Sequence, residues 1–300
     1  MTASSSIPFA ASQAEPPVWQ TSRFRIDLAT PVVMGIVNLT PDSFSDGGRH
    51  ASVPAALRHA EQLLQEGAAI LDLGAESTRP GSPAVPLEEE LQRLMPVLRE
   101  VVRLGVPVSI DTYKPEVMRQ ALEAGADIIN DIWALRQPGA LEAVVAHPRC
   151  GICLMHMHRT PQSMQVQPMA GDVLEPVRSF LAERTQVLHQ HGIARERVVL
   201  DPGIGFGKTV AQNFSLLARQ QALLALGYPL LAGWSRKSSL GAATGRDVAE
   251  RQAASVAAAL IAVQRGAAVV RVHDVAATVD ALKVWQSVQA ADAVPRADAS

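Results

Sequence analysis

The sequence predicts an α/β protein that forms a single (β/α)8 barrel, or TIM barrel, with its active site at the carboxyl ends of the strands. Two patterns predict it. Short apolar runs alternate with amphipathic stretches eight times over about 260 residues, and polar residues able to do chemistry follow every run. The chain has 300 residues, of which 48% are hydrophobic and 19% charged, so it is able to bury the core that such a barrel needs.

The eight expected strands are continuous apolar runs rather than alternating ones. This pattern is typical of parallel strands that are covered on both faces. The runs are 32–37, 69–73, 106–110, 127–129, 151–155, 198–200, 230–232 and 268–272.

Between the strands lie stretches with helical spacing of apolar residues, and several of them end near a glycine that would close a helix. The expected helices are 55–65, 87–104, 115–124, 139–146, 173–190, 211–226, 248–264 and 275–288. A doubly wound open sheet is the alternative fold, because strand order is read poorly from sequence.

No change of composition marks a second domain. We expect a flexible N-terminal leader over 1–22, the barrel over 23–290 and a C-terminal tail over 291–300. The 27 basic against 29 acidic residues and the 4% aromatic content speak against binding to nucleic acid or to a membrane surface. There is no signal peptide pattern, no run of ~18 apolar residues, and only two cysteines, so a cytoplasmic protein is expected.

Polar groups follow each of the eight expected strands. They are Asn38; Asp72, Glu76, Thr78 and Arg79; Asp111; Asn130 and Asp131; His156 and His158; Asp201; Ser235, Arg236 and Lys237; and Arg271 with His273. Any one of them alone is more simply a helix cap or a turn residue. Together they predict a site, because parallel strands of a barrel end at one edge.

These residues separate into two chemical types. Asp111, Asn130 and Asp201 suit a flat heterocycle with several N–H donors. The cations suit phosphate or diphosphate; they are Arg79, Arg236, Lys237, Arg271 and His273. The sequence therefore predicts a ligand with a donor-rich ring and an anionic end.

The same residues lie in segments that resemble one family, the dihydropteroate synthases of folate biosynthesis, which bind pterins. The segments are 34–48 (MGIVNLTPDSFSDGG), 72–81 (DLGAESTRPG), 109–115 (SIDTYKP), 129–132 (INDI), 154–157 (LMHM), 201–208 (DPGIGFGK), 235–237 (SRK) and 271–274 (RVHD). The resemblance spans about residues 32–290 and implies a transferase of the alkyl or aryl kind. Its reaction joins 6-hydroxymethyl-7,8-dihydropterin diphosphate to para-aminobenzoate and releases diphosphate.

The resemblance also implies roles for single residues. The pterin set is Asp111, Asn130, Asp201 and Lys237, with Ile132, Met155 and Phe206 as pocket walls. The diphosphate end is Asn38, Arg271 and His273, joined by Arg79, with Mg²⁺ as cofactor on Asn38. The aminobenzoate side is Thr78, Pro80, Phe206, Lys237 and Ser238, where sulfonamides would compete, and a lid carries Asp42, Phe44 and Ser45. The catalytic residues would be Asn38, Asp111, Asp201, Lys237 and Arg271.

One departure from the family pattern, one strand geometry and one surface remain. Trp133 follows Ile132 where a smaller or more polar residue is expected, so we expect it to reshape the pocket floor. Along an ideal strand Arg271 and His273 point the same way and would grip one diphosphate, apart from the ring-binding residues. The Ala-rich helix 248–264 is apolar on most faces and indicates either a helix packed on the barrel or the face of a homodimer, which the family also implies.

Other functions fit the sequence less well. A phosphate-binding loop at 201–209 fails because Pro202 stands where a glycine is required. Cys150 and Cys153 have metal-like spacing but lie in an expected buried strand. The pterin-binding domain of a folate-dependent methyltransferase has no use for a diphosphate site, so the cations at 235–237 and 271–273 speak against it. A pterin-binding protein without activity should have lost an anion-site or lid residue, and none is missing from this sequence.

Overall fold

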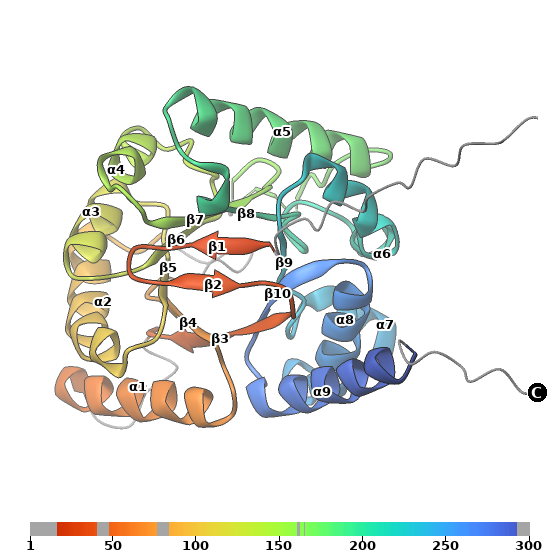
Figure 1. Ribbon diagram of the computed structural model, residues 1–300, viewed down its shortest axis with the longest axis horizontal. Coiled ribbons are helices and arrows are strands. Elements are labelled where there is room, and N and C mark those ends of the chain that lie inside the picture. The colour runs from red at the N-terminus through yellow and green to blue at the C-terminus, as the bar shows by residue number, and fades with distance from the viewer. Residues whose placement is uncertain (1–16, 41–47, 77–83, 161–162, 165, 293–300) are drawn as a thin grey trace, which may run out of the picture.

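A closed barrel of parallel strands forms the centre of the computed structural model, which describes residues 17–40, 48–76, 84–160, 163–164 and 166–292, apart from the side chains of 48–52 (Figure 1). Around the barrel the strands follow the order β10 (Ala267–Val272), β3 (Val32–Asn38), β4 (Ile70–Gly74), β5 (Val108–Asp111), β6 (Ile128–Asp131), β7 (Gly151–Met155), β8 (Val198–Asp201) and β9 (Leu230–Ala232). The predicted (β/α)8 barrel is confirmed, and the open sheet was the wrong alternative.

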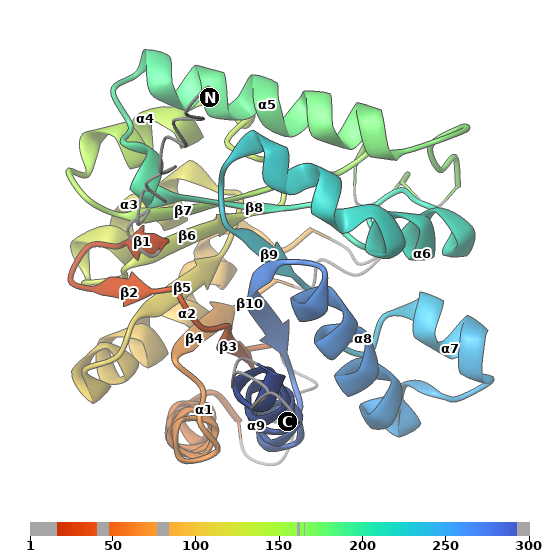
Figure 2. The same cartoon turned by 45° about the vertical axis from the view of Figure 1, so that its right-hand side comes forward.

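Helices surround the strands, as Figures 1 and 2 show. The α-helices are α1 (Gly48–Gln65), α2 (Leu87–Val101), α3 (Pro115–Glu123), α4 (Ala140–Ala146), α5 (Leu174–Gln190), α6 (Val210–Arg219), α7 (Ser238–Thr244), α8 (Gln252–Gln264) and α9 (Val275–Asp292). Short 3-10 segments are η2 (Val102–Leu104), η3 (Arg195–Arg197), η4 (Gln220–Leu226) and η5 (Val248–Glu250). The eight expected helices are confirmed, and α7 was missed because seven residues with an internal glycine carry too little periodicity.

Side chains along each strand alternate between two apolar clusters. On β10, Val270 and Val272 pack in the cluster beneath the helices, whereas Val269 lies in the cluster inside the barrel. On β4, Leu71 packs in the cluster beneath the helices and Ile70 in the cluster inside the barrel. The runs are largely apolar because both faces of the sheet are buried, and their polar residues stand mainly towards the carboxyl ends.

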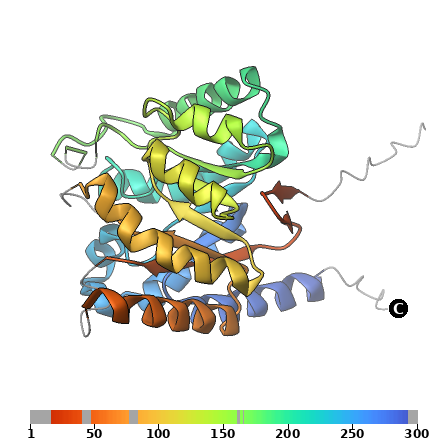
Figure 3. The same cartoon turned by 90° about the vertical axis from the view of Figure 1, so that its left-hand side faces the viewer.

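One end of the barrel is covered by a hairpin of β1 (Val18–Gln20) and β2 (Arg25–Asp27) (Figures 1 and 3). Trp19 is fully buried there, and its indole Nε1 donates to the carbonyl oxygen of Arg197 at 3.0 Å. Nη2 of Arg23 lies 2.6 Å from a carboxylate oxygen of Asp127.

The hairpin corrects the expected flexible leader over 1–22, because residues 17–22 are part of the packed structure. Two strands of three residues each are too short for their pattern to stand out in the sequence. At the other end of the chain, α9 continues to Asp292, two residues into the expected tail. Among the residues that the structure describes, no helix has both the length and the apolar character needed to span a membrane.

Candidate active site

The interior of the barrel changes from apolar to polar towards the carboxyl ends of the strands. Side chains of the inner cluster include Ile70, Ile128, Val199 and Val269. Two residues further along the same strands, and so on the same face, stand Asp72, Asn130, Asp201 and Arg271. Polar side chains therefore gather inside one end of the barrel, as the sequence predicts.

Arg271 links two carboxylates across this end. Its Nε donates to Asp72 at 2.6 Å, and its Nη2 donates to Asp111 at 2.7 Å. Asp72 is fully buried and also accepts a long hydrogen bond from Nδ2 of Asn130, at 3.5 Å. Arg271 therefore does not stand apart from the residues expected to bind the ring, because it forms an ion pair with Asp111, which is one of them.

Asp111 has the most unusual surroundings of the site. Burial raises its pKa to about 7, although the Arg271 guanidinium acts to lower it. Its Oδ2 accepts from Arg271, but its buried Oδ1 has no hydrogen-bond partner among the described residues. Since buried polar atoms are normally paired, Oδ1 is an acceptor suited to an N–H group of a ligand.

Asp201 ends β8 and is held by the turn that follows it. Its Oδ1 accepts from the backbone N–H of Gly203 at 2.7 Å. Burial raises the pKa of the carboxyl group, while this hydrogen bond and the positive charge of Lys237 act to lower it. Asp201 thus stands as a second buried carboxylate near the cations of the site.

The predicted pocket walls come together. Ile132, Met155 and Phe206 form one buried apolar cluster, and the ammonium of Lys237 lies 4.3 Å from the centre of the Phe206 ring. The sequence analysis missed Met157 and Met164, which are also buried in this cluster. Their signal was weak because methionine fills irregular space rather than following a pattern.

Trp133 lies at the border of this cluster. It packs against the cluster beside Tyr113, with the two ring centres 6.4 Å apart. The Arg136 guanidinium lies 5.2 Å from its ring centre. Trp133 thus contributes to the wall of the site rather than to the barrel interior.

His273 has a different partner from Arg271. Its Nδ1 lies 2.9 Å from Oγ of Ser235, which follows β9, whereas Arg271 reaches towards β4 and β5. Arg271 and His273 thus have different side-chain partners. Asn38 is the half-buried last residue of β3, and Ser238 is the exposed first residue of α7.

Some of the predicted site residues lie outside the described part of the chain. These are the lid residues Asp42, Phe44 and Ser45 and the aminobenzoate-side and anion-side residues Thr78, Arg79 and Pro80.

A buried charge network next to 77–83 was not predicted. Lys114 forms ion pairs with both Glu76 and Glu90, and Thr112 donates to Glu90 at 2.7 Å. The hydroxyl of Tyr113 donates to Glu76 at 2.9 Å, and burial first, then this contact, raises the pKa of Tyr113 to about 12. The network was missed because its members come from three separate segments of the sequence.

Cys150 and Cys153 do not converge on a metal. Both are buried thiols, one in the cluster beneath the helices and the other inside the barrel. Cys150 Sγ accepts from Nη2 of Arg197 at 3.1 Å. Over the described residues, no group of three histidine, cysteine or acidic side chains is arranged to hold a metal ion.

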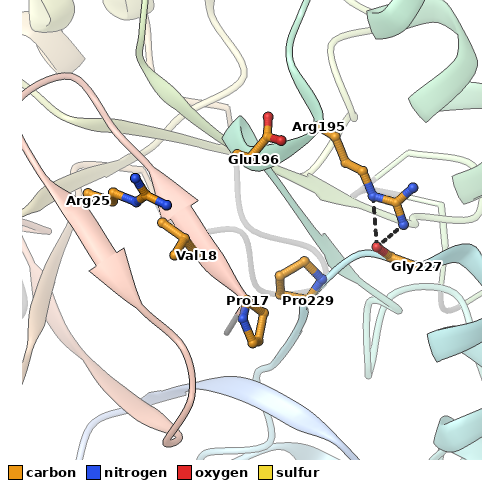
Figure 4. Close-up of a pocket in the computed structure, with 7 residues that line it drawn as sticks. All are labelled: Pro17, Val18, Arg25, Arg195, Glu196, Gly227 and Pro229. Carbon is orange, nitrogen blue, oxygen red and sulfur yellow. Dashed lines mark hydrogen bonds between the residues drawn. The ribbon is translucent and has the colours of Figure 1, made fainter. Parts of the chain in front are cut away.

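A hollow of about 280 Å³ lies at the opposite end of the barrel (Figure 4). Its lining comes from the hairpin and from the segments just before β8 and β9: Pro17, Val18, Arg25, Arg195, Glu196, Gly227 and Pro229. There Nε of Arg195 donates a hydrogen bond to the carbonyl oxygen of Gly227. The hollow is therefore separate from the polar carboxyl end that carries the candidate site.

Comparison with known proteins agrees with this geometry. A family profile described as "Pterin binding enzyme" matches residues 34–273. The dihydropteroate synthase of Neisseria meningitidis serogroup C is 53% identical over 274 residues, which are 90% of this chain and 97% of that protein.

Two solved structures extend the comparison. Burkholderia cenocepacia dihydropteroate synthase complexed with 7,8-dihydropteroate is 54% identical, with a TM-score of 0.84, and the match covers 92% of this chain and 98% of that one. Xanthomonas albilineans dihydropteroate synthase with 4-aminobenzoic acid is 53% identical, with a TM-score of 0.87 and coverage of 93% and 100%.

Proposed function

The chain belongs to the dihydropteroate synthases, a family of pterin-binding enzymes, and from that membership we propose how its side chains divide the work of the reaction. The enzyme is a transferase that condenses 6-hydroxymethyl-7,8-dihydropterin diphosphate with para-aminobenzoate to 7,8-dihydropteroate and diphosphate. The observation that carries the assignment of roles is the buried, unpaired Oδ1 of Asp111 beside the Arg271 guanidinium.

The pterin ring is bound by buried acceptors and an apolar wall. We assign the ring N–H groups to Asp111 and Asp201, with Asn130 beside them. A flat ring fits against Phe206 and Met155, which share one apolar cluster. Lys237, whose ammonium lies over the Phe206 ring, is suited to orient the ring carbonyl.

The diphosphate end is assigned to Arg271 and His273, with Arg79 from the sequence resemblance. Arg271 forms ion pairs with Asp72 and Asp111. Because a guanidinium has five N–H donors, it is able to keep a carboxylate while donating to a phosphate oxygen. Arg271 would then connect the charge of the leaving group with the carboxylate that binds the ring.

A magnesium ion fits beside the diphosphate. Within the described residues, Asn38 is the assigned ligand and no cluster of three acidic or histidine side chains accompanies it. That sparse donor set suits Mg²⁺, which keeps several waters and is commonly bound through one or two protein oxygens and the phosphates of the substrate. When bound, the ion would neutralise charge on the diphosphate.

The chemical step exchanges one bond for another at the pterin CH2. The bond from CH2 to the diphosphate oxygen breaks, with the electron pair leaving on diphosphate. A bond to the arylamine nitrogen forms, and this nitrogen then loses one proton, which diphosphate or water accepts. We propose a dissociative path, because the dihydropterin ring is able to delocalise the positive charge and the buried carboxylates of Asp111 and Asp201 stabilise it. The neutral arylamine needs no strong base before attack.

The aminobenzoate side is assigned through the family resemblance to Phe206, Lys237 and Ser238, together with Thr78 and Pro80 of the 77–83 segment. Sulfonamides, which resemble para-aminobenzoate, should compete there. The lid carrying Asp42, Phe44 and Ser45 should close over this side and exclude water, which would otherwise capture the cation.

We propose a homodimer in the cytoplasm. Ile261 on α8 and Val284 and Val288 on α9 are exposed apolar side chains, and the two helices pack against each other. Exposed apolar side chains on neighbouring helices are suited to a protein–protein contact. A reducing compartment is supported by Cys150 and Cys153, which are both free thiols.

The test of the function is release of diphosphate. The purified protein should release diphosphate from the pterin diphosphate in the presence of Mg²⁺ only when para-aminobenzoate is added, with one dihydropteroate formed for each diphosphate. Release at the same rate without para-aminobenzoate would contradict the assigned transfer.

A further inference from the structure

Lys208 is buried between β8 and α6. Only 2% of the residue is exposed, and its ammonium forms no ion pair within the described part of the chain. Burying a cation in this way disfavours folding unless its donors are satisfied. The groups that accept from these donors show which part of the chain Lys208 holds in place.

The ammonium of Lys208 is surrounded by acceptors. Its Nζ donates to the carbonyl oxygens of Gly203 at 2.8 Å and Phe206 at 3.3 Å, and that of His156 lies 3.5 Å away. Nδ1 of His156 lies 2.9 Å from the same atom. A charged ammonium has donors only, so in that state Nδ1 of His156 accepts and the imidazole is neutral; burial lowers the pKa of Lys208 itself to about 7. Burial first, and then the charge of Lys208, lower the pKa of His156 to about 2, in agreement with a neutral ring.

The turn around this cation has a backbone that only glycine adopts readily. Gly203, Gly205 and Gly207 have φ values of 70°, 84° and 73°. A Cβ at Gly203 would overlap the carbonyl oxygen of His156. The turn therefore has one specific path, and Lys208 binds carbonyl groups along it.

The residues that Lys208 binds also carry the groups of the active site. Gly203 donates its N–H to the Asp201 carboxylate at 2.7 Å and accepts from Lys208 through its carbonyl oxygen. Phe206 accepts from Lys208 through its carbonyl oxygen, and its ring lies in the apolar wall under Lys237. One ammonium is thus connected, through one residue each, to a carboxylate and to a ring of the site.

We propose that Lys208 is a positioning residue, whose ammonium binds the carbonyl groups of Gly203 and Phe206 and thereby fixes the Asp201 carboxylate and the Phe206 ring for the pterin. Lys208 itself touches no substrate in this role. The inference rests on the assignment of Asp201 and Phe206 to the pterin site under Proposed function.

The experiment compares Lys208→Met with Thr209→Ala. Methionine keeps an unbranched, flexible side chain but donates no hydrogen bond. Thr209 is the next residue and caps α6 by accepting from the Gln212 N–H at 3.2 Å, so its loss weakens the same junction without touching the carbonyl groups. Binding of a diphosphate-free pterin is measured by calorimetry, and hydrogen exchange of the 203–207 amides is measured without ligand.

Lys208→Met should weaken pterin binding about tenfold or more and speed exchange of the Gly203 amide, while Thr209→Ala binds within about twofold of the parent protein. Lys208→Gln, which keeps two N–H donors, should recover part of the affinity. If Lys208→Met folds with unchanged affinity and unchanged exchange, the positioning role is overturned.

Two further outcomes separate this inference from the proposed function. If Asp201→Ala leaves pterin affinity unchanged, the assignment of the site fails and the inference fails with it. If Asp201→Ala weakens binding but neither Lys208 variant folds while Thr209→Ala does, Lys208 serves stability and the inference alone is overturned.

Discussion

The Arg271 guanidinium joins two groups of side chains that the sequence pattern keeps apart. It lies between Asp72 and Asp111, so a group assigned to the leaving diphosphate also neutralises a carboxylate that binds the ring. The strand ends predict which residues reach the site. The direction in which a long side chain then turns depends on partners from other strands, and the sequence does not give it.

Arg271→Ala should lower turnover about a hundredfold, because the developing charge on diphosphate loses a cation worth roughly 3 kcal/mol in the transition state. Without the guanidinium, which acts to lower the pKa of Asp111, that pKa should rise above about 7. At neutral pH the variant should therefore bind a diphosphate-free pterin more weakly than the parent protein, and the difference should shrink as pH rises. Affinity that is unaffected at all pH values would show that the contact with Asp111 does not serve binding.

Asp201→Ala should weaken binding of a diphosphate-free pterin at least tenfold, because a buried ring N–H left without its acceptor costs about 1–3 kcal/mol. The matched control is Asp172→Ala, which removes an exposed carboxylate paired with Arg219 on the surface. Calorimetric titration should find the parent affinity for the control. The same affinity for Asp201→Ala would remove Asp201 from the pterin site.

His156→Asn should reduce the loss of stability in acid. The pKa of His156 falls from 6.5 to about 2 on folding, first because of burial and then because of Lys208. Between these values the unfolded chain binds a proton that the folded chain does not. Stability is thus fully present above pH 6.5 and is lost as pH falls below it, by about 1.4 kcal/mol per pH unit.

Urea unfolding of both proteins at pH 7 and pH 5 tests this expectation. Asparagine keeps an oxygen that is able to accept from Lys208. Asp111 and Asp131 change stability in the opposite direction, since burial raises their pKa values to about 7 and about 6, but they are present in both proteins. An equal decrease for the two proteins would mean that His156 takes up its proton in the folded state.

Among the elements, the barrel strands were predictable because both of their faces are buried, which makes the runs continuously apolar. The hairpin of β1 and β2 was not, since its stability comes from distant contacts such as those of Trp19 with Arg197 and of Arg23 with Asp127. Likewise, the sequence excludes a phosphate-binding loop in the turn after β8, but it does not show that Lys208 at the end of this turn is buried. In each case the missing information was a partner remote in sequence.

Trp19→Ala should destabilise the fold by about 3–5 kcal/mol, because it removes a fully buried indole and its hydrogen bond to the Arg197 carbonyl oxygen. Trp285→Ala on α9 is the matched control, since Trp285 is only half-buried and should cost less. Denaturant unfolding compares the two. Equal losses would indicate that the hairpin adds little to the stability of the barrel.

At the scale of the whole molecule, the exposed side chains of α8 and α9 predict association. Val284→Lys should shift the proposed homodimer towards monomer, because a charge is placed among the exposed apolar side chains of these helices, which include Ile261 and Val288. Val210→Lys is the control, since Val210 is an exposed residue at the start of α6. Sedimentation at matched concentrations measures the oligomeric state of the parent protein and of both variants. A parent protein that is monomeric at all concentrations would contradict the proposal.

The closure of the barrel has a consequence for synthesis on the ribosome. β3 pairs with β10, which begins at residue 267 of 300, so the first barrel strand meets its last neighbour only when about nine-tenths of the chain exists. Until then β3 and β9 both present open edges, and open strand edges recruit other chains. We therefore expect a chain truncated before residue 267 to aggregate more readily than the full-length chain, because it lacks the strand that covers both edges.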